Sequence, residues 1–231
     1  MAIESVAAIL QARMGSTRFP GKTLAPFGDS TVLGHMLERL RRVSHPLDLV
    51  VATTDLGGDD VVAAASAQAG ARVFRGPAHD VLARFAACIE SLPERPALIL
   101  RICADRPLLC PNLVDELLDA YDELGSPDYL SNNLPPSYPD GLDLELVRTE
   151  CLEEGNRESN DLYEREHVTA FVYRRPERFR LAALLCPFGN FSHVRLALDT
   201  REDYERLTRL NARLPTHYDY RDVLTAVELA A

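Results

Sequence analysis

Short apolar segments alternate with longer amphipathic segments along the first half of the chain. The apolar segments 5–10, 47–52, 72–75 and 97–103 have the length and aliphatic character of buried strands. Between them, the spacing of apolar residues predicts helices at 31–43, 59–69 and 80–91, followed by a helix that opens at Pro111. This alternation predicts right-handed crossovers and an α/β fold of three layers, in which helices cover both faces of a mostly parallel sheet.

Helix boundaries are indicated by capping residues. Asp29 or Ser30 can cap the helix at 31–43, and Gly70 ends the helix at 59–69. In the second half, residues 125–143 are rich in Pro, Gly and Asn and too long for a simple connection, so we expect them to have a functional role. After them the pattern predicts strands at 142–147, 179–186 and 194–199, a helix around 163–173, and a helix capped by Thr200.

Composition and charge exclude several classes of protein. With 231 residues, of which 46% are apolar and 26% charged, the chain has the balance of a soluble globular protein with one core. Its net charge of −10 argues against a protein that coats nucleic acid or an anionic membrane, because such surfaces are met by net positive charge. Any anion must therefore be bound by a local pocket.

The apolar run at 6–10 is too short for a membrane span and lacks the basic flank of a signal peptide, so we expect a cytoplasmic protein. The five cysteines include no CxxC pair, and we expect reduced thiols. The 25 basic residues comprise 24 Arg and one Lys. A bias toward Arg codons explains the arginines, whereas the single Lys22 marks a place where a compact ammonium group is required.

The segment 11–23 combines features of a polyphosphate cradle. It follows a predicted strand and contains two glycines, hydroxyl residues and three cations, Arg13, Arg18 and Lys22. The end of a P-loop pattern, Gly-Lys-Thr, is present at 21–23, but that pattern requires Gly at position 16, where this chain has Ser16. An ordinary basic surface loop is the alternative interpretation.

This segment resembles the signature of nucleotidyltransferases that activate acidic sugars with CTP, especially the spore-coat-polysaccharide-type cytidylyltransferases. The enzymes that make CMP-ketodeoxyoctonate and CMP-sialate are related. The motifs that carry the resemblance occur in order along nearly the whole chain: Ala12-Arg13-x-x-Ser16-Thr17-Arg18-x-Pro20-Gly21-Lys22, Val50 to Asp55, Val73 to Gly76, Asp80-Val81-Leu82-x-Arg84, Tyr138-Pro139-Asp140-Gly141-Leu142-Asp143-x-Glu145, Glu164 to Thr169 and Leu198-Asp199-Thr200.

The resemblance implies a GT-A-like nucleotidyltransferase fold with a mixed sheet, in a single domain over 1–231 with a substrate-contact or dimer-contact insertion around 125–190. It also implies a homodimer that uses CTP and a sugar acid in surface polysaccharide biosynthesis, with release of pyrophosphate. Arg13, Lys22 and Asp105 are the expected catalytic residues. The expected nucleotide-binding residues are Leu10, Ala12, Arg13, Gly15, Ser16, Arg18, Lys22 and Arg101.

Two aspartates are candidate magnesium ligands, because a nucleoside triphosphate is handled as its magnesium complex. Asp105 follows one predicted strand and Asp199 ends another, where the resemblance places metal ligands. Taken singly, each could instead be a turn or helix cap. The related enzymes carry Gly-Asp-Cys-Pro at the first site, whereas this chain has Ala104-Asp105-Arg106-Pro107, which puts a bulky cation beside the expected metal.

Five further residues are expected to bind the sugar. Asp143 and Glu145 are two apart on a predicted strand and point to the same face. His167 is a candidate base, although a single His on a helix is more often structural. The full set is Asp140, Asp143, Glu145, Arg165 and His167. For Arg75, Arg84 and Arg101, surface or structural ion pairing is the stronger interpretation.

The expected reaction is in-line attack of the anomeric hydroxyl of the sugar on the α-phosphate of CTP, with catalysis by positioning and charge neutralisation. Two alternatives stay open. One is a metal-dependent glycosyltransferase, although Asp105-Arg106-Pro107 is not a DxD motif. The other is a nucleotide-binding regulatory protein without turnover, which Arg106 beside the metal site favours.

Overall fold

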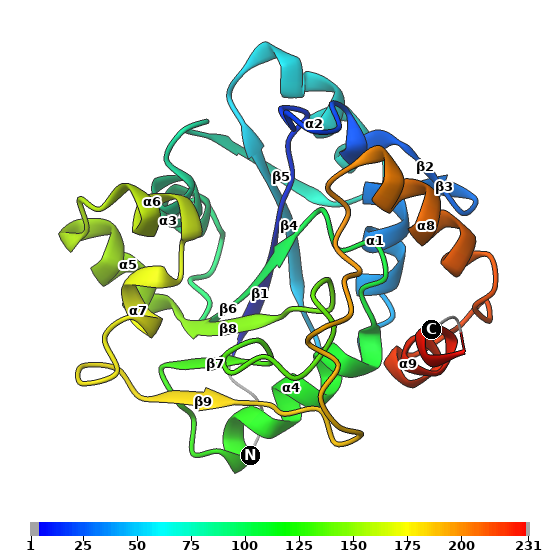
Figure 1. Cartoon of the computed structure of the whole chain (residues 1–231). Coiled ribbons are helices and arrows are strands. Elements are labelled where there is room, and N and C mark those ends of the chain that lie inside the picture. Colours follow the sequence, from blue (N-terminus) through cyan, green and yellow to red (C-terminus); the bar gives the residue numbers. More distant parts are fainter. Residues whose placement is uncertain (1–4, 230–231) are drawn as a thin grey trace.

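A seven-stranded sheet forms the centre of the molecule (Figure 1), as the computed structural model of residues 5–229 shows. The strand order is β5-β4-β1-β6-β8-β7-β9. β1 (Val6–Gln11) pairs in parallel with β4 (Asp48–Thr54) and β6 (Leu98–Cys103), and β5 (Arg72–Gly76) pairs in parallel with β4. Only β8 (Glu145–Arg148) runs antiparallel to its neighbours β6 and β7 (Tyr129–Ser131), whereas β9 (Leu181–Ala183) is parallel to β7. The mixed, mostly parallel sheet confirms the predicted fold class.

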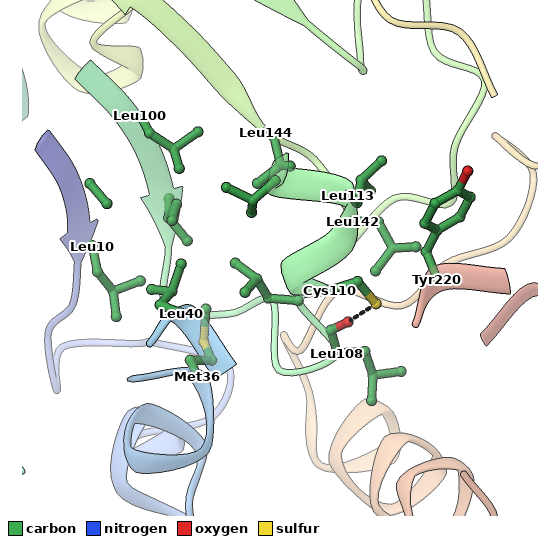
Figure 2. Close-up of a cluster of buried hydrophobic side chains, with 14 of the residues drawn as sticks. Leu10, Met36, Leu40, Leu100, Leu108, Cys110, Leu113, Leu142, Leu144 and Tyr220 are labelled. Atoms are coloured by element: carbon green, nitrogen blue, oxygen red, sulfur yellow. Dashed lines mark hydrogen bonds between the residues drawn. The ribbon is translucent and has the colours of Figure 1, made fainter. Parts of the chain in front are cut away.

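Alternate residues of β1 serve two separate cores, as the period of two along a strand requires. Ala8 and Leu10 belong to the core that is covered by α1 (Val32–Leu40), α4 (Pro111–Glu123), α8 (Arg201–Asn211) and α9 (Tyr220–Glu228). Figure 2 shows part of this core, to which β1 contributes Leu10, α1 contributes Met36 and β6 contributes Leu100. Ala7 and Ile9 belong to the opposite core, which is covered by α3 (Val81–Glu90), α5 (Thr149–Glu158) and α7 (Ala170–Tyr173). The sheet is therefore buried on both faces.

The helix caps agree with the sequence in most places. Asp80 caps α3 through the backbone N–H of Ala83, and Thr200 caps α8 in a reciprocal capping box with Asp203. α1 differs from the prediction, because its cap is Thr31, whose hydroxyl accepts from Gly34 N, and neither Asp29 nor Ser30. The remaining short elements are η1 (Lys22–Leu24), β2 (Pro26–Phe27), β3 (Ser30–Thr31), η2 (Gly57–Asp59) and α2 (Asp60–Gln68).

Predictions for the second half of the chain needed more correction. The segment 125–143 contains the short strand β7, β8 begins at Glu145 rather than at 142, and α5 was not predicted. The helix expected around 163–173 is divided into α6 (Leu162–His167) and α7, because Val168 adopts a φ of 53° and closes a tight turn in which Thr169 N donates to His167 O.

Residues 194–199 form an extended strap rather than the predicted strand. Leu196, Ala197 and Leu198 are buried, so the apolar run reflects packing against the core. The backbone of the strap forms no ladder among the described residues; it makes an isolated bridge between Asp140 and Arg195, and Leu198 N donates to Asp105 O. α9 was also missed. None of the described helices is long and apolar enough to cross a membrane, and the five cysteines form no disulfides with one another.

Candidate functional site

Two adjoining cavities lie beyond the carboxyl ends of the parallel strands, where ligands bind in open α/β sheets. The loop cavity, of about 410 Å³, is lined by the segment after β1, by Asp105 after β6 and by Asp199 from the strap. The strand cavity, of about 570 Å³, extends from it over β6 and β8 toward α6 and α7. The two cavities share Gln11, Ala12, Arg13, Cys103, Asp105, Glu166 and His167.

The loop after β1 is held in place by buried hydrogen bonds. The carboxylate of Asp59 accepts from Met14 N at 2.6 Å and from the Thr54 hydroxyl, and Thr23 Oγ1 donates to Arg13 O at 2.9 Å. Gly21 has a φ of 77°, a conformation that favours glycine, and leads directly into η1 at Lys22. A Cβ at Gly15 would meet nothing within 4 Å, so the loop presents open backbone to the cavity.

The three cations of this loop differ in their surroundings. Arg13 is exposed and, within residues 5–229, no carboxylate pairs with its side chain. The Arg18 side chain is 64% exposed and places Nη2 2.9 Å from Asp199 Oδ1. Lys22 is only 12% exposed and lies deepest. Two exposed cations and one largely buried cation therefore surround the loop cavity.

Lys22 joins the two aspartates that the sequence proposed as metal ligands. Its Nζ donates to Asp105 Oδ2 at 3.3 Å, to Asp199 Oδ1 at 3.2 Å and to Leu198 O at 2.6 Å. Burial opposes ionisation of Asp199, but the hydrogen bond and charge of Lys22 outweigh it and lower the pKa of that carboxyl. The strap thus brings a carboxylate 177 residues away in sequence to the loop after β1.

The donor set fits a magnesium ion that is shared with phosphate groups. Asp105 Oδ1 is buried and has no hydrogen-bond partner among the described residues, although Arg106 Nε lies 3.6 Å away. If Asp105 and Asp199 each gave one oxygen to an octahedral ion, water and phosphate oxygens would take its other positions. Mg²⁺ is commonly held in this way. The described residues contain no cluster of three or more acidic, His or Cys side chains that could hold a metal alone.

Arg106 lies beside this carboxylate pair but makes its shorter contacts with two other acids. Its Nη1 lies 2.7 Å from Asp140 Oδ1 and its Nη2 2.9 Å from Asp143 Oδ2. Burial disfavours the charged guanidinium, but Asp143, Asp105 and Asp140 together raise the pKa of Arg106. The cation that departs from the family motif is therefore neutralised locally.

The strand cavity contains a buried charge network. Arg101 and Glu145 form an ion pair, and Glu145 also accepts hydrogen bonds from Tyr129 at 2.8 Å and from Thr169. Burial would raise the pKa of Glu145, yet Arg101 and the two hydroxyl donors lower it. His167 ends α6, lines both cavities and packs against the ring of Tyr163 at 4.2 Å between centroids.

The structure brings most of the predicted site residues to these cavities. The loop cavity is lined by Ala12, Arg13, Gly15, Ser16, Arg18, Lys22, Asp105, His167 and Asp199, and the strand cavity also by Arg101, Asp143 and Glu145. Leu10 lines neither cavity, because its side chain is fully buried in the core. Arg165 lines neither, because its guanidinium binds Asp80 at 2.6 Å and Asn156. Asp140 is also outside both, held between Arg106 and Arg195.

Four residues of the site were not singled out from the sequence, or were interpreted otherwise. Asp59 anchors the loop, Glu166 lines both cavities, and Arg195 contacts Asp199. Arg84, for which a structural role was favoured, donates to Pro77 O but also lines the strand cavity with a buried Nε that has no partner among the described residues. Burial and the charge of Arg13 lower the pKa of Arg84. Arg75 makes the structural pair expected, with Asp60 at 2.6 Å.

Comparison with known proteins gives a consistent result. The sequence profile of a family described as cytidylyltransferase matches residues 7–229. The chain is 36% identical over 210 residues to the spore coat polysaccharide biosynthesis protein SpsF of Bacillus subtilis (strain 168). The match covers 87% of this chain and 84% of SpsF. It is 30% identical over 205 residues to 3-deoxy-manno-octulosonate cytidylyltransferase of Anaeromyxobacter dehalogenans (strain 2CP-C), over 89% of this chain and 77% of that one.

A solved structure is similar throughout. The cytidylyltransferase from Leptospira borgpetersenii serovar Hardjo-bovis (strain JB197) superposes with a TM-score of 0.91 at 32% identity and covers 98% of this chain and 95% of its own. The same fold therefore extends over the loop, the strap and both cavities.

Proposed function

The chain belongs to the cytidylyltransferase family and is a nucleotidyltransferase, and from this premise we propose that it transfers a cytidylyl group from CTP to a hydroxyl group of an acidic sugar. The products would be a CMP-sugar and pyrophosphate. Similarity to SpsF, whose name places that protein in spore coat polysaccharide biosynthesis, supports a role in making a surface polysaccharide.

The contact of one ammonium group with two distant carboxylates is the observation that carries this proposal. In-line transfer at the α-phosphate needs positive charge where pyrophosphate departs and a rigid frame that aligns the attacking hydroxyl. Arg13 and Arg18 would close on the β- and γ-phosphates, Arg18 by leaving its exposed pair with Asp199, while Lys22 is held where the triphosphate would meet Asp105 and Asp199.

Magnesium is the proposed cofactor. Asp105 and Asp199 would hold it, and when bound it would neutralise charge on the phosphate oxygens. Lys22 would keep the two carboxylates together before the nucleotide arrives and would donate to a phosphate oxygen afterwards, since its three N–H groups can exchange partners without moving the backbone.

The strand cavity is the proposed site for the sugar. Four arginines line it, Arg13, Arg84, Arg101 and Arg106. Arg101 and Arg106 are already paired with acids, so Arg13 and Arg84 are the ones that would offer a guanidinium to a substrate carboxylate. Asp143, Glu145 and Glu166 line the same wall and can accept hydrogen bonds from sugar hydroxyls. His167 lies at the junction of the two cavities, where a proton of the attacking hydroxyl could be accepted. Similarity to 3-deoxy-manno-octulosonate cytidylyltransferase supports a sugar acid as substrate.

A screen for pyrophosphate release tests this function. Purified protein with Mg²⁺ is given each of the four nucleoside triphosphates with a panel of ketodeoxy, nonulosonate and uronate sugar acids. We expect release with CTP and at least one sugar acid. Release of a nucleoside diphosphate from a sugar nucleotide would identify a glycosyltransferase instead, and CTP binding without turnover on any sugar acid would identify a regulatory protein.

We also propose a homodimer formed through the segment 125–190. Within that segment α6 exposes two large apolar side chains, Leu162 at 85% and Tyr163 at 49%, which a partner copy would cover. Light scattering is expected to give twice the chain mass of 25.7 kDa, and a monomer at working concentration would exclude the proposal.

A further inference from the structure

Six charged side chains of alternating sign form a closed ring of contacts, and three of them, Lys22, Asp105 and Asp199, line the loop cavity. The ring runs through Lys22, Asp105, Arg106, Asp140, Arg195 and Asp199, and returns to Lys22. Asp140 lies opposite Lys22 in this ring. Its Oδ1 is 2.7 Å from Arg106 Nη1 and its Oδ2 is 2.6 Å from Arg195 Nη1.

Each arginine of the ring also contacts one of the two proposed metal ligands, and Arg106 has a further partner in Asp143, whose Oδ2 lies 2.9 Å from its Nη2. Arg106 Nε lies 3.6 Å from Asp105 Oδ1, and Arg195 Nη2 contacts Asp199 Oδ2. Asp140 therefore reaches Asp105 through one guanidinium and Asp199 through the other. A planar guanidinium that binds two carboxylates fixes their relative orientation, because its N–H groups project in set directions.

Backbone hydrogen bonds also attach the strap to residues of this ring. Asp140 N donates to Val194 O at 3.0 Å, and Leu196 N donates to Asp140 O at 2.5 Å. Farther along, Leu198 N donates to Asp105 O at 2.9 Å. The strap that carries Asp199 is thus attached both to residue 140 and to residue 105.

We propose that Asp140 is a positioning residue, which fixes the separation of the Asp105 and Asp199 carboxylates through Arg106 and Arg195. This assignment replaces the substrate-binding role expected from the sequence, because Asp140 lines neither cavity. It rests on the proposed function only in taking Asp105 and Asp199 as the ion-binding pair. It also gives Arg106 a role, since this residue contacts both Asp140 and Asp105 and so helps to fix the position of the Asp105 carboxylate.

Without the Asp140 charge, Arg195 loses the carboxylate that shares its guanidinium with Asp199, and Arg106 keeps Asp143 but loses its contact with Asp140. Both guanidinium groups would then be able to reorient about Asp105 and Asp199 and to compete with a divalent ion for these carboxylates. Residues that orient metal ligands without touching the metal commonly change metal affinity by about 10-fold to 100-fold when replaced.

The test is the affinity of the full-length protein for Mn²⁺ alone, measured by electron paramagnetic resonance of the free ion. D140N is expected to weaken Mn²⁺ binding by about 10-fold, and D140E to recover part of the loss. CTP affinity measured without metal is expected to be unchanged in D140N, since Arg13, Arg18 and Lys22 remain. The matched control is D48N, which removes an Asp–Arg pair of similar exposure, 42% against 39%, at the opposite end of the sheet.

A second variant keeps the inference testable if D140N fails to fold. Arg195 is 47% exposed, so R195Q removes the connection from Asp140 to Asp199 without disturbing the core. R195Q should weaken Mn²⁺ binding in the same direction as D140N, and the double variant should bind Mn²⁺ no more weakly than D140N alone, because D140N already breaks the contact with Arg195.

Equal Mn²⁺ affinities for wild type, D140N and D48N would overturn the inference, and so would a wild-type affinity that D105N leaves unchanged. Failure of the proposed function has a different signature. In that case Mn²⁺ binding would still depend on Asp105 and Asp140, whereas no sugar acid would release pyrophosphate from CTP.

Discussion

Arg101 and Glu145 stand directly opposite each other on the antiparallel strands β6 and β8, and their side chains form an ion pair in the wall of the strand cavity. The two side chains are 11% and 15% exposed. Tyr129 and Thr169 donate to the same carboxylate, so the last strand of the parallel part of the sheet is attached to α7 through Glu145. A charged pair at this depth makes the cavity both polar and rigid.

Removing the Glu145 carboxylate should destabilise the fold more than removing a carboxylate from an ion pair at the surface. E145Q leaves the Arg101 guanidinium buried without a countercharge, a change that typically costs about 3 to 5 kcal/mol. The control is E153Q, which breaks the Arg95–Glu153 pair, where the arginine is 52% exposed and a loss below about 1 kcal/mol is expected. Urea unfolding measures both, and equal losses would show that the buried pair has no special weight.

Acid should destabilise the protein through the same carboxylates. The pKa values of Glu145 and Asp199 are lowered below their ordinary values of 4.5 and 3.8, because Arg101 and Lys22 respectively outweigh burial. The unfolded chain therefore binds more protons than the native protein as pH falls below about 4.5. The stability that these groups contribute is complete above that pH and is lost as pH falls through the native pKa values.

Urea unfolding at several pH values between about 6 and 3 checks this sign. The free energy of unfolding should decrease steadily on acidification, and the decrease should be smaller in E145Q, which no longer has the titrating group. A free energy that increases between about pH 5 and 3 would contradict the assigned directions.

Asp59 should affect nucleotide binding although it touches no ligand. Its carboxylate is 4% exposed and holds Met14 N at 2.6 Å, so D59A leaves that N–H without its acceptor and frees the loop that carries Arg13 and Arg18. We expect a stability loss of about 1 to 3 kcal/mol and a rise of roughly 10-fold in the KM for CTP, as positioning is lost.

The neighbouring Asp60 supplies the control for this prediction. It pairs with Arg75 at 2.6 Å, its side chain is 66% exposed, and it makes no contact with the loop. D60A should keep the wild-type KM for CTP. If D59A and D60A give the same KM, the loop does not depend on the buried carboxylate.

Sequence patterns predicted correctly the elements in which the local pattern of residues matches their burial in the fold. The buried strands β1, β4 and β6 are continuous apolar segments, and α3 and α8 begin at capping residues that the structure uses. α5 was missed because its buried face is small and includes Gly155, where a Cβ would lie 3.0 Å from the Phe171 ring. The strap was taken for a strand because it contains an apolar run, and Leu196, Ala197 and Leu198 are all buried even though almost no ladder forms.

The site was predictable in its residue types and not in its pairings. Lys22, Asp105 and Asp199 were identified from motifs, but their contact depends on a strap that brings residue 199 back to the loop, and no local pattern contains that path. Asp140 and Arg165 belong to family-like motifs, yet neither lines a cavity, because Asp140 is held by Arg106 and Arg195 and Arg165 is held by Asp80. A motif shows which residues occur together, whereas only the folded chain shows which ones face a ligand.

The central claim is that Lys22 acts on the triphosphate that Asp105 and Asp199 also approach. The most direct measurement is kcat/KM for pyrophosphate release by K22A, with CTP and a sugar acid that the wild-type enzyme accepts. Loss of a charge contact that acts in the transition state predicts a decrease of roughly 100-fold or more. A decrease below about threefold in a variant that still folds would remove Lys22 from catalysis and contradict the account.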